Sequence, residues 1–228
     1  METKRISTGC ESLDQLLGGG VEEGVITNFY GDSGTGKTNA CIQITAEVAE
    51  SGETVIYIDT EASFSPERFE QIASEDALEN VMLRDSTSFE DQKDAVRDLE
   101  EMASEQEIGL VVVDSIVSLY RLKVDSGNAS EVNQELSRQF SKLSRIAREQ
   151  DIPVLVTNQV YTSFDEDELE LVGRDVPRYW SKCLVKLSQK DQGLREAEIL
   201  KHRSRPEGNS VRFRITDDGL EASNEGIL

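Results

Sequence analysis

The chain has 228 residues and a formal net charge of −21 at pH 7, from 45 acidic and 24 basic residues. This length suits one domain with a substantial core, and a single histidine excludes a histidine-based metal cluster. Because the acidic residues are spread along the chain, we favour a solvated surface suited to a high-salt cytoplasm over a partner with a basic surface.

The sequence also lacks the usual marks of secretion or membrane insertion. Cys10, Cys41 and Cys183 are scattered and show neither a disulfide framework nor metal-ligand spacing. We see no signal peptide at the amino terminus and no apolar run long enough to span a bilayer. These features predict a cytoplasmic protein.

The first predicted unit is a strand over 25–30, a glycine-rich loop and a helix over 38–51. The loop matches the phosphate-binding pattern G-x-x-x-x-G-K-[S/T], whose backbone N–H groups surround a phosphate at a helix amino terminus. Its lysine would reach the β- and γ-phosphates, and its threonine hydroxyl would bind Mg²⁺. The pattern therefore predicts ATP and Mg²⁺ as ligands of the loop residues Gly31, Asp32, Ser33, Gly34, Thr35, Gly36, Lys37 and Thr38.

Further along the chain, short apolar runs alternate with helical patterns. The runs at 54–58, 110–113 and 154–156 are nearly continuous, as in strands that are buried on both faces of a parallel sheet. Helical patterns cover 88–102, where Ser88 and Asp91 have capping-box spacing, and 131–150. This alternation predicts an α/β fold with a central, mostly parallel sheet that is flanked by helices.

The last quarter of the chain has the pattern of a β-hairpin region. The segment 182–189 alternates apolar and polar residues, and strands are predicted over 198–200 and 211–215. We expect these three strands to form an antiparallel extension of the sheet, within a single domain over 1–228.

Polar residues follow each apolar run, and the carboxyl ends of parallel strands are where such sheets bind ligands. Asp114 would hold Mg²⁺ and Glu61 would orient or deprotonate the attacking water. Gln159 would bind the γ-phosphate and report its presence. We therefore predict Glu61, Lys37 and Gln159 as catalytic residues, with Thr38 and Asp114 at the metal. The alternatives are that Asp114 only caps a turn at its strand end, that Glu61 is a surface glutamate, and that Gln159 forms only strand-end hydrogen bonds.

Two groups of basic residues stand out in this acidic chain. The densest group contains Lys201, Arg203 and Arg205. It would contact DNA phosphate or a nucleotide on a neighbouring subunit. The alternative is that it is only the solvated end of a strand. Arg138, Lys142 and Arg145 share one helix face, which we interpret first as solvated and second as a DNA or partner surface.

Taken together and in order, several segments resemble the RecA-like recombinases, particularly archaeal RadA. The segments are Ile6–Gly9, Leu13–Gly20, the phosphate loop, Tyr57–Glu61 and Val156–Val160. The short length and the segments 178–183 and 201–208 are most similar to the RadB branch. The resemblance implies a RecA-like P-loop ATPase core, ATP binding with weak hydrolysis, and a role in homologous recombination and DNA repair.

The resemblance also implies partners and further site residues. DNA and the main recombinase RadA would be partners, and copies of the chain could associate through the ATP interface. It implies the roles given above for Lys37, Thr38, Glu61, Asp114 and Gln159, and it places Arg68 near the adenine. The Lys201-x-Arg203 spacing is similar to the trans-acting finger of KaiC-type ATPases.

Departures from RadA point to an accessory or mediator role. Only five residues precede Ile6, so we expect neither the amino-terminal DNA-binding domain nor the polymerisation motif. Five carboxylates at 165–168 and 170 would oppose DNA, and Arg174, Arg178 and Lys182 would offset them only in part.

Two other functions remain open. One is a KaiC-like signalling ATPase that acts through protein assembly. That group usually places two glutamates together after the second strand, whereas here Ala62 follows Glu61. The other is a nucleotide-binding scaffold with negligible turnover.

Overall fold

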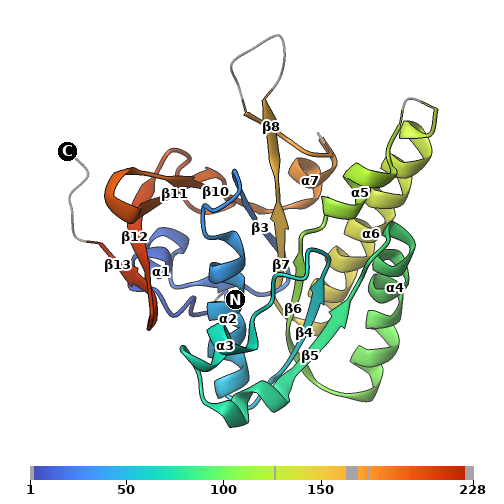
Figure 1. Cartoon of the computed structure of the whole chain (residues 1–228). Coiled ribbons are helices and arrows are strands. Elements are labelled where there is room, and N and C mark those ends of the chain that lie inside the picture. Colours follow the sequence, from blue (N-terminus) through green and yellow to red (C-terminus); the bar gives the residue numbers. More distant parts are fainter. Residues whose placement is uncertain (1–2, 126, 163–168, 174, 224–228) are drawn as a thin grey trace.

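A nine-stranded sheet organises the described part of the chain, which in this computed structural model comprises residues 3–125, 127–162, 169–173 and 175–223 (Figure 1). From one edge to the other, its strands are β13 (Gly219–Ala222), β12 (Ser210–Thr216), β11 (Leu194–Lys201), β10 (Cys183–Gln189), β3 (Ile26–Tyr30), β7 (Val154–Asn158), β6 (Ile108–Asp114), β4 (Thr54–Asp59) and β5 (Val81–Asp85).

The sheet has a parallel and an antiparallel part, as the sequence predicts. The strands from β5 to β10 all run parallel to their neighbours, whereas β11, β12 and β13 follow as antiparallel partners. The segment 182–189 forms β10, which starts the antiparallel extension by pairing with β11. On its other side β10 pairs in parallel with β3, with Val185 opposite Phe29, so it joins the two parts of the sheet. Its alternating pattern arises because its outer face is partly solvated.

Apolar side chains of the parallel strands pack into two separate cores. In β4, Tyr57 joins one core while Ile56 and Ile58 join the other, which follows from the two-residue period of a strand. This explains why these runs are continuously apolar: both faces are covered.

Different helices cover the two faces (Figure 1). One core contains residues of α1 (Glu11–Leu17), α2 (Lys37–Glu50) and α3 (Pro66–Glu70), and the other contains residues of α4 (Phe89–Glu105), α5 (Ser118–Lys123) and α6 (Ala129–Gln150). The predicted capping box at the start of α4 is present, because Ser88 accepts from the Asp91 amide and Asp91 accepts from the Ser88 amide.

Several short elements had no clear signal in the sequence. They are the two-stranded pair β1 (Arg5–Ile6) and β2 (Val21–Glu22), the two-stranded pair β8 (Val160–Thr162) and β9 (Leu169–Leu171), α7 (Asp175–Trp180) and the 3₁₀ helices Glu75–Asn80 and Asp191–Gly193. Edge strand β5 was also missed. It is half solvated and contains charged residues, so it lacks the apolar run of the central strands.

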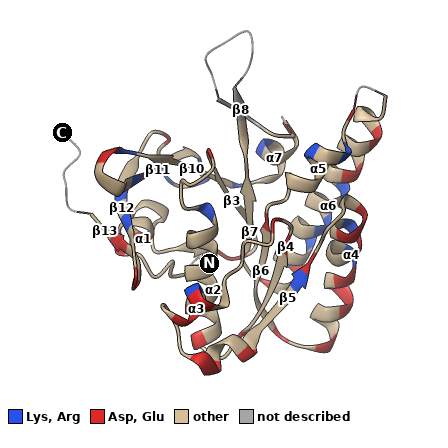
Figure 2. Cartoon of the chain, viewed as in Figure 1, with Lys and Arg blue, Asp and Glu red and all other residues tan. Residues whose placement is uncertain are grey.

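Charged residues occur along helices and strands, and acidic and basic positions are mixed on α4 and α6 (Figure 2). On α6, Lys142 and Arg145 both pair with Glu100 of α4, the former at 3.0 Å, and Arg138 pairs with Glu135 of its own helix at 3.3 Å. This basic helix face is therefore engaged in ion pairs. None of the helices in the described residues combines the length and apolar character that a bilayer crossing requires.

Candidate nucleotide site

The predicted site residues meet at the carboxyl-end edge of the parallel strands. The glycine loop follows β3, Glu61 follows β4, Asp114 ends β6 and Gln159 follows β7. These four strands are consecutive in the sheet, in the order β3, β7, β6 and β4, and run parallel, so their carboxyl ends lie on one side of it. The structure therefore brings together the groups that the sequence analysis assigned to phosphate, metal and water.

The glycine loop has the backbone conformation that a phosphate cradle needs. Gly34 and Gly36 have φ values of 76° and 100°, in the left-handed region that favours glycine. Gly36 precedes the first residue of α2, whose amino terminus has no side-chain cap. The amide donors of its first turn are therefore available to an anion, and the helix dipole adds to the attraction.

The glycine loop packs closely against β10 and β12. A Cβ atom on Gly36 would lie 3.1 Å from Ile215 of β12, and one on Gly31 would lie 2.1 Å from the Leu187 carbonyl oxygen of β10. A side chain at position 31 would thus collide with backbone, and one at position 36 would require Ile215 to shift.

The Lys37 side chain folds back over its own loop. Its ammonium donates to the carbonyl oxygens of Gly31 at 3.0 Å and Asp32 at 2.8 Å. Partial burial lowers the pKa of Lys37, while Asp114, Glu61 and Asp32 act in the opposite direction. The ammonium is thus held, partly desolvated, in the loop, where a phosphate would attract it strongly.

Asp114 lies in a dense set of hydrogen-bond donors that the sequence analysis did not identify. It is 2% exposed and accepts from the Tyr57 hydroxyl at 3.0 Å, from Ser63 at 3.3 Å and from Thr157. These donors come from β4, the loop after β4, and β7. They fix the orientation of the carboxylate, as outer partners of metal ligands commonly do.

The Tyr57 hydroxyl should contribute measurably to this arrangement. Tyr57 is fully buried, and burial together with the nearby Asp114 raises its pKa well above the ordinary value, so it stays a neutral donor. We expect Tyr57→Phe to lower the free energy of unfolding by about 1.5–3 kcal/mol, because a hydrogen bond to a charged group is lost. Urea unfolding without Mg²⁺ measures this.

Tyr179→Phe provides the matched control for Tyr57→Phe. Tyr179 is 71% exposed, and the same loss of a hydroxyl there should change stability by less than about 0.5 kcal/mol. Equal stabilities of Tyr57→Phe and the unaltered protein would show that the hydroxyl does not support Asp114.

Glu61 and Gln159 contact each other. The Gln159 amide nitrogen donates to Glu61 Oε1 at 2.6 Å, and its amide oxygen accepts from Arg121 of α5 at 2.8 Å. Partial burial and the proximity of Asp114 raise the pKa of Glu61, while Lys37 and hydrogen bonds from Gln159 and Ser118 act in the opposite direction. The structure thus pairs Gln159 with the proposed base, whereas the sequence predicted a contact with the γ-phosphate.

Three further residues shape the strand ends. The Asp59 carboxylate accepts from the backbone amides of Glu61, Ser63 and Phe64 at 2.8–3.0 Å. Thr60 and Ser115 exchange two hydrogen bonds of 2.8 Å, which join the ends of β4 and β6. In the sequence, these residues stand out only by their positions at strand ends, and those positions do not reveal their hydrogen-bond partners.

Arg68 on α3 connects the nucleotide loop to the last strands. Its guanidinium donates to Asn39 at 3.0 Å, to Gln71 at 2.7 Å and to the Asp217 carbonyl oxygen at 3.0 Å. These contacts place Arg68 beside the first turn of α2 and the β12–β13 turn. Its predicted place near an adenine stays a prediction.

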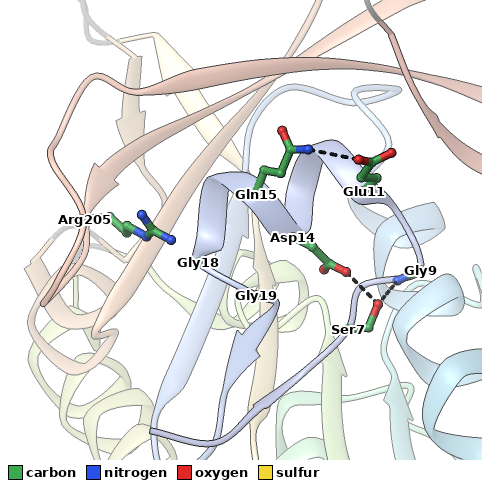
Figure 3. Close-up of a pocket in the computed structure, with 8 residues that line it drawn as sticks. All are labelled: Ser7, Gly9, Glu11, Asp14, Gln15, Gly18, Gly19 and Arg205. Carbon is green, nitrogen blue, oxygen red and sulfur yellow. Dashed lines mark hydrogen bonds between the residues drawn. The ribbon is translucent and has the colours of Figure 1, made fainter. Parts of the chain in front are cut away.

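The predicted basic finger is largely engaged within the chain. Lys201 donates to the Arg178 carbonyl oxygen at 2.7 Å, and Arg203 pairs with Glu22, whose side chain is 4% exposed. Arg205 reaches the end of α1, where a Cβ atom on Gly18 would lie 2.4 Å from its guanidinium. It lines a hollow of about 530 Å³ (Figure 3). Arg203 and Arg205 thus lie against the amino-terminal segment, whereas Lys201 contacts α7.

The donor set fits a magnesium nucleotide. Mg²⁺ is usually held by one or two oxygen ligands together with phosphates and waters, which agrees with one carboxylate, Asp114, and one hydroxyl, Thr38. Among the described residues, no group of three or more His, Cys, Asp or Glu side chains could form an all-protein metal site. Residues 165–168 of the predicted acidic segment and Arg174 lie outside the described residues.

Comparisons with known proteins show which family the chain resembles. The family described as Rad51 matches residues 1–223. A protein of Methanococcoides burtonii named "DNA repair and recombination protein RadB" is 40% identical, covering 95% of this chain and 97% of its own length. Similar proteins of that name occur in Methanosphaera stadtmanae (39% identical, 92% of each chain) and Methanoculleus marisnigri (40% identical, 96% of this chain and 99% of its own).

Proposed function

The chain belongs to the Rad51 family of RecA-like recombinases, and from this premise we propose that it is a RadB-like accessory protein of homologous recombination and DNA repair. In this role it binds ATP with Mg²⁺, hydrolyses ATP weakly, and acts on DNA beside the main recombinase RadA. The observation that carries the proposal is the convergence of the glycine loop, Asp114 and Glu61 at one edge of the sheet.

Each residue has a defined task in this proposal. The loop amides and Lys37 bind the phosphates, while Thr38 and Asp114 hold the metal ion, which would neutralise charge on the phosphates. Glu61 orients water against the terminal phosphate, which is the main requirement for hydrolysis because water is a weak nucleophile.

The ion pairs of Arg203, Lys142 and Arg145 support an accessory role. These basic residues are already paired within the chain, which leaves less positive charge for a phosphate backbone. In a chain of net charge −21, DNA binding is then expected to be weak and strongly salt-dependent.

We predict that binding to DNA and to RadA depends on bound nucleotide. DNA binding is measured by fluorescence anisotropy with labelled single- and double-stranded DNA, with and without a slowly hydrolysed ATP analogue. RadA binding is measured with immobilised RadA of the same organism under the same two conditions. Both should be repeated from low to molar salt. Lys37→Ala, which should bind ATP more weakly, is the matched control and at limiting nucleotide should behave like the nucleotide-free protein.

The outcomes separate the candidate functions. Nucleotide-dependent binding to RadA or DNA supports the accessory role. Nucleotide-dependent self-assembly without either partner would instead support a KaiC-like signalling ATPase. Binding of ATP with neither turnover nor assembly would leave a nucleotide-binding scaffold.

A further inference from the structure

Arg121 makes a contact at the nucleotide edge that neither the sequence motifs nor the proposed mechanism uses. It lies in the last turn of α5, and its guanidinium donates to the Gln159 amide oxygen at 2.8 Å. The amide nitrogen of the same Gln159 donates to Glu61 at 2.6 Å. Arg121, Gln159 and Glu61 therefore form one continuous chain of hydrogen bonds.

The chemistry of the three groups allows only one orientation of the central amide. A guanidinium only donates hydrogen bonds, and an ionised carboxylate only accepts them. The amide oxygen of Gln159 must then face Arg121, and its NH2 group must face Glu61. Without Arg121, one end of the Gln159 side chain would have no protein partner in this chain of bonds.

The helix that carries Arg121 is firmly placed. Leu119 and Tyr120 of α5 are buried, at 5% and 7% exposure, and the Tyr120 hydroxyl donates to Asn133 of α6 at 2.8 Å. Ser118 also forms a hydrogen bond with Glu61. Ser118 and Arg121 are three residues apart and so share a helix face. One face of α5 thus reaches both members of the Glu61–Gln159 pair.

We propose that Arg121 is a positioning residue: by fixing the amide of Gln159, it holds the Glu61 carboxylate in the orientation that the proposed hydrolysis needs. This inference rests on the proposed function. Because Arg121 is exposed, its hydrogen bond contributes little to folding stability. Its effect is geometric, since a small displacement of the group that orients water slows the reaction.

Steady-state ATPase measurements on three variants test the role. Arg121→Ala should lower kcat on the order of 10-fold while the KM for ATP and the affinity for Mg²⁺-ATP stay within about twofold. Arg121→Lys, which keeps one donor, should restore part of the lost rate. Lys123→Ala is the matched control, because Lys123 lies on the same helix but pairs with Glu90 at 3.0 Å. An unchanged kcat in Arg121→Ala, or an equal loss in Lys123→Ala, overturns the proposal.

A second readout does not depend on turnover. The two side-chain NH2 protons of Gln159 can be followed by nitrogen-resolved NMR and assigned by their loss in Gln159→Glu. In Arg121→Ala both resonances should shift and move closer together, because the amide is no longer held at both ends. Lys123→Ala should leave them in place.

The two measurements distinguish failure of this inference from failure of the proposed function. If the unaltered protein hydrolyses no ATP while Arg121→Ala still moves the Gln159 resonances, the hydrolytic function fails but Arg121 does position Gln159. If the unaltered protein hydrolyses ATP and Arg121→Ala changes neither kcat nor the resonances, the inference is wrong and the proposed function stands.

Discussion

Replacing Lys37 with alanine is expected to weaken the binding of Mg²⁺-ATP by roughly 10- to 150-fold, which corresponds to about 1.5–3 kcal/mol for a charge-assisted hydrogen bond. The ammonium lies over the glycine loop at 3.0 and 2.8 Å from two of its carbonyl oxygens. It is partly desolvated there, so its attraction to phosphate is less screened by water. Isothermal titration calorimetry with a slowly hydrolysed analogue measures the loss.

Two controls make the Lys37 result specific. Lys93→Ala removes an exposed lysine from α4 and should leave ATP affinity unchanged, which excludes a general effect of net charge. Circular dichroism should show that Lys37→Ala remains folded. Undiminished affinity in a folded Lys37→Ala protein would refute the assignment of the loop as the phosphate site.

Glu61→Gln is expected to lower ATP turnover by roughly 10²- to 10⁴-fold, the usual contribution of a positioned general base. The amide has the same shape and its oxygen can still accept from the Gln159 NH2 group, but it cannot accept a proton from water. Binding of Mg²⁺-ATP should remain, because Glu61 is not assigned to the phosphates. Single-turnover hydrolysis with excess protein measures the chemical step directly.

Glu70→Gln on α3 is the matched control for Glu61→Gln. Glu70 is exposed and follows the same strand, so its replacement should not change turnover. Undiminished hydrolysis in Glu61→Gln would show that another group activates water.

Glu61→Gln is also predicted to change the stability of the fold. Because the pKa of Glu61 is raised in the folded state, its ionisation destabilises the fold as pH rises from the ordinary glutamate range through the folded pKa. Glu61→Gln removes this cost. The variant should therefore be more stable than the unaltered protein at pH 7, and the difference should vanish at acid pH, where both forms are neutral. Thermal unfolding across this pH range measures the crossover.

The sequence predicted most of the parallel sheet because its signals are local. The loop from Gly31 to Thr38 contains its whole pattern in eight residues, and the runs before Glu61 and Asp114 show burial on both faces directly. The α4 capping box was predicted for the same reason, since both of its partners lie within one helical turn.

The missed features depend on contacts between residues far apart in the chain. Nothing local to Tyr57 or Thr157 indicates that both donate to Asp114, because strand order brings them together. Likewise, Arg203 looked available for a phosphate, but its partner Glu22 lies near the opposite end of the sequence. Spacing in the sequence reveals charge density and does not reveal which charges are neutralised after folding.

The packing of Ile215 against Gly36 has a consequence for how the protein is made. A ribosome synthesises the glycine loop early and β12 much later. The emerging chain therefore contains the complete phosphate motif before the strand that packs against it has been made. A nascent chain halted before β12 therefore lacks the packing of Ile215 against the loop, which the chain gains only when synthesis is nearly finished.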